Sequence, residues 1–127
     1  MHLENRVGII FLQLLFLEGH SNCESGDIFT DVGRSTNGQW CAYIDTIHDI
    51  INKKILGTDN NPSQWYFPLN KKKDNIGQLR IDNNRTRILV QNINMLIDVT
   101  VCNSNCKTLW KRCVEQIIRA LEILSNP

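Results

Sequence analysis

An apolar run near the amino terminus constrains the architecture of this chain more than any other segment. Val7–Leu17 is apolar except for Gln13, and polar or small residues follow it at Glu18–Asn22. A run of this length matches the hydrophobic region of a secretory signal peptide, whereas a membrane span needs about 20 apolar residues. We therefore predict a signal peptide at residues 1–21, cleaved after Ser21. The alternatives are a buried core helix and, less favoured because the run is short, an uncleaved membrane anchor.

The predicted mature chain, residues 22–127, has the length of a single domain and an odd number of cysteines. The five are Cys23, Cys41, Cys102, Cys106 and Cys113. In a small secreted domain this density is typical of disulfides. One thiol is left over, and it could join two copies of the chain in a disulfide-linked dimer. An extracellular, disulfide-stabilised domain is therefore predicted.

Two segments have the apolar spacing of an amphipathic helix. In Trp40–Leu56 one face contains Trp40, Ile44, Ile47, Ile51 and Ile55, and Gly57 follows as a candidate C-cap. Near the carboxyl terminus one face contains Trp110, Cys113, Val114, Ile117, Ile118, Leu121 and Leu124. The second pattern predicts a long helix with Cys113 facing the core.

The C-terminal helix limits how the cysteines can pair. Cys106 and Cys113 are seven residues apart, which on a helix separates their Cα atoms by roughly 10 Å, too far for a disulfide. We therefore predict two long-range bridges, which join Cys23 and Cys41 to two of the three C-terminal cysteines.

Residues 79–90 have the pattern of a β-hairpin. Leu79–Ile81 and Thr86–Val90 are β-prone and flank the turn-forming residues 82–85. An N-glycosylation sequon begins at Asn84 in this turn, so we predict a glycan on Asn84 at the hairpin tip.

Residues 87–101 fit two patterns. As a strand, one side contains Leu89, Ile93, Met95, Ile97, Val99 and Val101; as a helix, one stripe contains Leu89, Ile93, Leu96, Ile97 and Val101. β-Branched residues dominate the second half and favour the strand. The predicted fold is therefore α+β, with two amphipathic helices bracketing a small antiparallel β-hairpin or meander and disulfides stabilising the domain. A small all-α helical bundle is the alternative.

The candidates for catalysis are few. His48 is the only histidine in residues 22–127, so a zinc site built from several histidines is excluded. No phosphate-binding loop, dinucleotide motif or nucleophile elbow occurs in the sequence. We expect no cofactor, no metal and no catalytic residue, and place His48 at the edge of the core.

Two neighbouring segments are candidates for an interface with an extracellular protein. The aromatic residues are Trp65, Tyr66 and Phe67, and the basic residues are Lys71, Lys72 and Lys73. Aromatic side chains are enriched at interfaces, and a lysine run could bind an acidic polysaccharide. Residues 22–127 contain 13 Lys and Arg against 11 Asp and Glu, a net charge of +2. This small excess argues against nucleic acid as a partner, and no membrane span is expected in the mature chain.

These observations favour a secreted protein-binding domain without catalysis, acting as a ligand, inhibitor or effector. A secreted enzyme of unrecognised type and a carrier of a small apolar ligand are the alternatives. An exposed aromatic patch over a closed core would favour the protein binder. A cleft that gathers His48 with carboxylates would favour the enzyme, and a cavity of a few hundred Å3 would favour the carrier.

Overall fold

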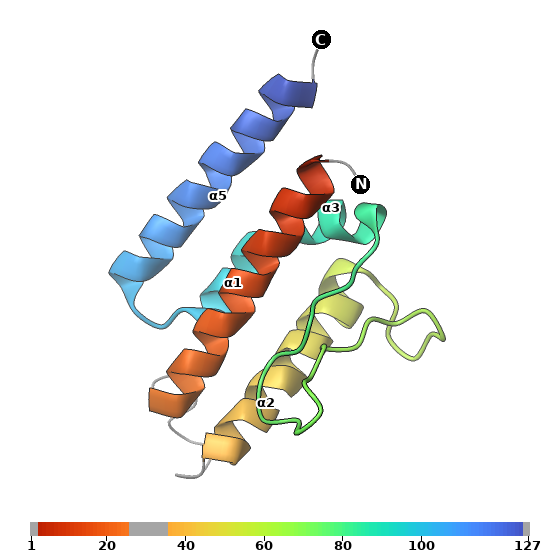
Figure 1. Ribbon diagram of the computed structural model, residues 1–127, viewed down its shortest axis with the longest axis vertical. Coiled ribbons are helices and arrows are strands. Elements are labelled where there is room, and N and C mark those ends of the chain that lie inside the picture. The colour runs from red at the N-terminus through yellow and green to blue at the C-terminus, as the bar shows by residue number, and fades with distance from the viewer. Residues whose placement is uncertain (1–2, 26–35, 126–127) are drawn as a thin grey trace.

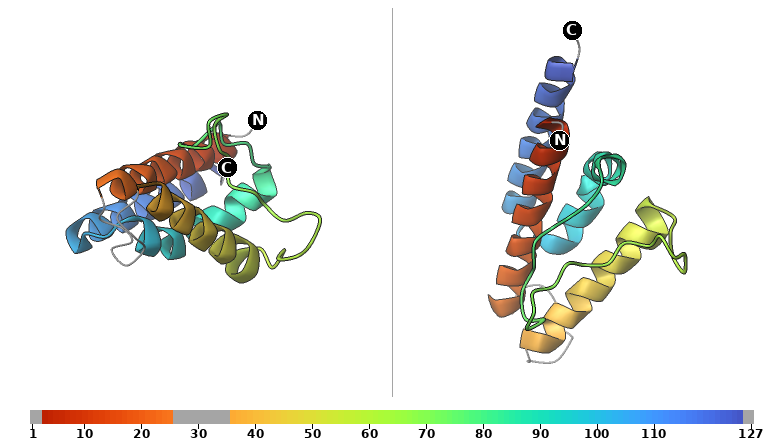
Figure 2. Two further views of the ribbon diagram at one scale, coloured as in Figure 1. Left: turned by 90° about the horizontal axis from the view of Figure 1, so that it is seen from below. Right: turned by 45° about the vertical axis from the view of Figure 1, so that its right-hand side comes forward.

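The computed structural model describes residues 3–25 and 36–125, and its regular elements are helices (Figure 1). In chain order they are α1 (Leu3–Ser25), α2 (Thr36–Asp49), the π-helix η1 (Ile50–Ile55), α3 (Asn83–Gln91), α4 (Ile93–Thr100) and α5 (Ser104–Ser125). Strand-type pairing in these ranges is confined to one antiparallel bridge, between Leu69 and Ile76. In Figure 1, α1 lies between α2 and α5, with α3 and α4 behind it, and the right-hand view of Figure 2 shows α3 and α4 between α1 and α2.

The first helix supplies a large part of the hydrophobic core. Its buried apolar side chains are Phe11, Leu12, Leu15, Phe16 and Cys23. This packing agrees with the alternative of a core helix for the segment, whereas cleavage after Ser21 and secretion stay predictions. Within residues 3–25 and 36–125, no helix combines the length and the apolarity that a bilayer crossing requires.

Two glycines let α1 approach its neighbours closely. A Cβ atom on Gly19 would lie 2.4 Å from the ring of Tyr43 in α2, and one on Gly8 would lie 2.5 Å from the Cγ2 atom of Thr86 in α3. The Tyr43 hydroxyl in turn lies 2.9 Å from the Thr100 hydroxyl of α4, inside the core. Packing without space for a methyl group is typical of an ordered protein interior.

The helix predicted for Trp40–Leu56 is confirmed and corresponds to α2 continued by η1. Trp40, Ile47 and Ile51 of the predicted apolar face are buried, while Ile44 and Ile55 pack against the core from its edge. Gly57 follows with a φ of 66°. This left-handed conformation is common just after a helix and favours glycine, so the predicted terminus is confirmed as well.

The predicted β-hairpin at residues 79–90 is wrong, because the turn-forming residues begin a helix instead. The Asp82 side chain accepts a hydrogen bond from the Arg85 amide at 2.9 Å and so caps the first turn of α3. An aspartate in a turn and an aspartate at a helix N-cap use the same side-chain chemistry. Asn84 is exposed in this first turn rather than at a hairpin tip, and its glycosylation stays a prediction.

The strand favoured for residues 87–101 is also wrong. The side chains of the alternative helical stripe are all buried: Leu89, Ile93, Leu96, Ile97 and Val101. The strand interpretation also required Met95 and Val99 to face the core, but Met95 is 43% exposed. Burial of an amphipathic stripe outweighs the weak preference of β-branched residues for strands. The α+β class is therefore corrected to the all-α alternative.

The disulfide-stabilised architecture is the third correction, because the five cysteines, all within the described residues, form no disulfide. Cys23 is buried in α1, whereas Cys41, Cys102, Cys106 and Cys113 are exposed. The predicted C-terminal helix is confirmed as α5, but Cys113 lies on its outer face. The core is closed by helix packing, including an edge-to-face contact of Phe11 with Trp110 at 5.2 Å.

Candidate functional site

The aromatic residues predicted as an interface are divided between core and surface. Trp65 and Phe67 are buried, whereas Tyr66 is 65% exposed. Phe67 packs against Phe16 with a centroid distance of 5.0 Å and against Trp40 at 5.5 Å. This segment therefore pins its loop to the core and presents a single large aromatic side chain outward.

Asn52 of η1 and His48 of α2 hold this loop by hydrogen bonds to its main chain. The Asn52 amide donates to the Trp65 carbonyl at 2.9 Å and accepts from the Trp65 amide at 2.8 Å. One turn earlier, Nε2 of His48 accepts a hydrogen bond from the Phe67 amide at 2.7 Å. Because Nε2 must be unprotonated to accept, the structure assigns His48 a neutral imidazole and a structural position.

The surroundings of His48 lower its pKa. Burial is the main cause, and the nearby Asp45 and Asp49 carboxylates oppose it. In the unfolded chain the pKa of a histidine is about 6.5. At pH values between the lowered pKa of folded His48 and about 6.5, the unfolded chain therefore binds more protons than the folded chain. Stability that depends on neutral His48 is complete above this window and is lost as the pH falls through it.

We expect acidification from pH 7 toward 5 to lower the free energy of unfolding through His48. In a His48→Gln variant the Gln oxygen can still accept from Phe67, so part of the pH dependence should disappear. Urea unfolding at several pH values measures this, with His20→Gln as the matched control. Equal pH slopes for wild type and His48→Gln would contradict the assignment.

Cysteine reactivity follows burial. Burial, with smaller contributions from the Cys102 thiol and the Glu24 carboxylate, raises the pKa of Cys23 to about 12. Cys23 is therefore protonated at neutral pH and unreactive.

Lys71, Lys72 and Lys73 are exposed on the loop after Phe67, where a role as a basic interface stays a prediction.

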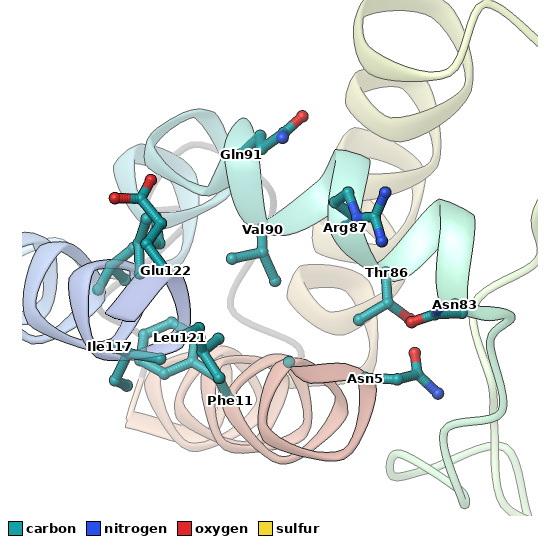
Figure 3. Close-up of a pocket in the computed structure, with 13 residues that line it drawn as sticks. Asn5, Phe11, Asn83, Thr86, Arg87, Val90, Gln91, Ile117, Leu121 and Glu122 are labelled. Carbon is teal, nitrogen blue, oxygen red and sulfur yellow. The ribbon is translucent and has the colours of Figure 1, made fainter. Parts of the chain in front are cut away.

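A largely apolar opening lies where α1, α3 and α5 meet (Figure 3). Its volume is about 390 Å3. The residues that line it are Asn5, Gly8, Phe11, Asn83, Thr86, Arg87, Val90, Gln91, Val114, Ile117, Ile118, Leu121 and Glu122. Figure 3 shows Val90 pointing from α3 toward Phe11 of α1 and Leu121 of α5. We call this site the α1–α3–α5 pocket.

A buried side-chain oxygen in this pocket lacks a hydrogen bond. Asn5 is 6% exposed, and its side-chain oxygen has no hydrogen-bond partner among the described residues. Figure 3 shows this oxygen turned toward Thr86, whose own hydroxyl donates to the Asp82 carbonyl at 2.8 Å. An unpaired buried carbonyl oxygen costs about 1–3 kcal/mol, so a donor that reached it would be favoured.

The sequence did not identify the α1–α3–α5 pocket. Asn5, Gly8 and Phe11 fall in the predicted signal peptide, and Thr86 and Val90 fall in the predicted hairpin. The apolar face predicted for α5 was the available signal, since Val114, Ile117, Ile118 and Leu121 belong to it. An apolar helix face predicts that another part of the chain packs on it, but it does not predict which part or whether a cavity remains.

Other chemistry is not assembled in the part of the chain that the structure describes. There, no three His, Cys, Asp or Glu side chains gather in a way that could hold a metal ion. Comparison with known proteins adds no relative: no protein-family model, no curated protein and no solved structure matches this chain.

Proposed function

We propose that this protein is a non-catalytic carrier whose α1–α3–α5 pocket binds a small, mostly apolar molecule. The observation that supports it is a pocket of about 390 Å3 with apolar walls from three helices. Ligand sites commonly have volumes of about 300–1,000 Å3 and mainly hydrophobic walls with a few polar groups. Among the functions that the sequence left open, this geometry favours the carrier.

The unpaired side-chain oxygen of Asn5 restricts the class of ligand that the pocket would bind. The unpaired Asn5 oxygen is an acceptor at the edge of an apolar space formed by Phe11, Val90 and Ile118. A ligand with an apolar body and one hydrogen-bond donor, such as a hydroxyl or an aromatic N–H, would satisfy both features. Such a ligand would pair the buried oxygen while its body replaces water against the walls.

The alternatives have less support. An aromatic interface would require an exposed patch, but Trp65 and Phe67 are in the core. An enzyme built on His48 would require a free imidazole, but its Nε2 accepts from the Phe67 amide. Binding of an extracellular protein through the lysine run stays a separate prediction.

Indole and N-methylindole form a matched pair of probes for this proposal. Indole has an N–H donor, and N-methylindole has the same ring without one. Calorimetric titration of the full chain should show saturable binding of indole and about tenfold weaker binding of N-methylindole, the loss expected for one unpaired buried acceptor. Equal affinities would contradict the role of Asn5, and absence of binding by both would contradict the proposed pocket.

Filling the pocket provides a second measurement. We expect Val90→Phe to abolish indole binding because its ring would occupy the space that Val90 faces, while far-UV circular dichroism stays helical. Met95→Phe is the control, since Met95 is 43% exposed on α4 outside the pocket. If Val90→Phe unfolds the chain, Ile118→Phe tests the same space from α5. Unchanged indole binding in a folded filled variant would place the ligand elsewhere.

A further inference from the structure

The outer face of α5 has a regular pattern that the core does not use. Six exposed residues follow one another at steps of three, four, three, four and three: Cys106, Leu109, Cys113, Gln116, Ala120 and Ile123. Leu109 is 60% exposed and Ile123 is 74% exposed. Figure 1 shows α5 at the edge of the molecule, with its C-terminal end extending beyond α1. We call these six residues the α5 seam.

Alternating steps of three and four are the spacing of a two-stranded coiled coil. The inner face of α5 contains different residues, among them Trp110, Val114 and Ile118, which lie in the core or pack against it. The helix therefore has two separate apolar stripes, one covered and one exposed. We propose that the α5 seam pairs in parallel with the α5 seam of a second copy of this chain.

Charge favours the parallel orientation. Arg112 and Arg119 flank the seam along one side, each one residue before a seam position. An antiparallel pair would bring Arg112 of one copy opposite Arg119 of the other, and this like-charge contact is unfavourable. A parallel pair instead places Arg112 beside Ile117 of the second copy, which carries no charge, and avoids this repulsion.

The two exposed cysteines agree with pairing between identical helices. In a parallel pair, Cys106 faces Cys106 of the second copy, and Cys113 faces its equivalent. Helices about 8–10 Å apart bring equivalent seam Cα atoms to within roughly 6 Å, inside the range that a disulfide spans. An antiparallel pair instead places Cys113 opposite Gln116, where no such bond can form.

The covalent step requires an oxidant, for which we name a small-molecule disulfide. Two facing thiols lose their protons as a new S–S bond forms between the copies, and the small-molecule disulfide is cleaved and reduced to two thiols. The thiolate of one cysteine first attacks the small disulfide, and the second copy's thiolate then displaces the bound half. Because the seam is short, the disulfides would make an otherwise weak pair persistent.

Oxidised glutathione added to the full chain tests the proposal. We expect a covalent dimer whose peptide map contains Cys106–Cys106 and Cys113–Cys113 links and which reverts to monomer on reduction. Glutathione adducts on Cys106 and Cys113 without dimer would overturn the proposal. So would dimers linked mainly through Cys41 of α2 or through Cys102, which lies between α4 and α5.

Substitutions that leave the cysteines in place distinguish a dimer that forms by pairing of the α5 seams from one that forms by collision of exposed thiols. Leu109→Glu combined with Ile123→Glu puts charges into the seam and should lower the yield of dimer about tenfold, since charge burial at an interface centre is strongly unfavourable. Met95→Glu changes an exposed apolar residue on α4 and should have no effect. Equal yields from all three proteins would show that the thiols meet by collision. Indole binding tests the α1–α3–α5 pocket on the inner face of α5, so its result does not depend on whether the seam pairs.

Discussion

Deletion of residues 1–21 is expected to abolish cooperative folding of this protein. The deleted segment supplies Phe11, Leu12, Leu15 and Phe16 to the core. Burial of such a side chain stabilises by about 1.5–3 kcal/mol. Four of them together are comparable with the total stability of about 5–15 kcal/mol typical of a domain. Far-UV circular dichroism and urea unfolding of the shortened chain measure this, and we expect loss of the sigmoidal transition.

A pair of point variants controls for the deletion. Leu15→Ala removes a side chain with no exposed surface and should destabilise by about 2–5 kcal/mol. Leu14→Ala changes the neighbouring side chain, which is 52% exposed, and should have a much smaller effect. A shortened chain that unfolds like the full chain would instead show that α1 is dispensable, in agreement with the predicted cleavage after Ser21.

Helical periodicity was the most reliable guide to the fold. The stripes in Trp40–Leu56 and in the C-terminal helix were predicted because their polar and apolar residues separate clearly at helical spacing. At residues 87–101 two periods fitted the same residues, and only the position of the covering helices distinguishes them. Met95 shows the reason: its side chain is 43% exposed, and within residues 3–25 and 36–125 no helix covers that face of α4. A sequence cannot report such an absence.

The amino-terminal segment shows a different limit. A signal-peptide hydrophobic region and a buried core helix are both short apolar runs, so composition does not separate them. Gly8 and Gly19 have meaning only once Thr86 and Tyr43 are seen to lie against them. The pocket was missed for the same reason, because its walls come from three elements that are distant in the sequence.

The second large effect is expected at Phe67. Its ring contacts Phe16, Trp40, Tyr43 and Trp65, with centroid distances from 5.0 to 6.3 Å. Replacement of a buried phenylalanine by alanine usually destabilises by about 3–5 kcal/mol, and Phe67→Ala should do so here because it removes a ring that packs the loop against α1 and α2. The adjacent Tyr66→Ala is the matched control, since Tyr66 is 65% exposed and its loss should change the unfolding midpoint little. Urea unfolding of both variants decides between a core anchor and an interface: a folded Phe67→Ala protein of wild-type stability would return this segment to the role of a binding surface.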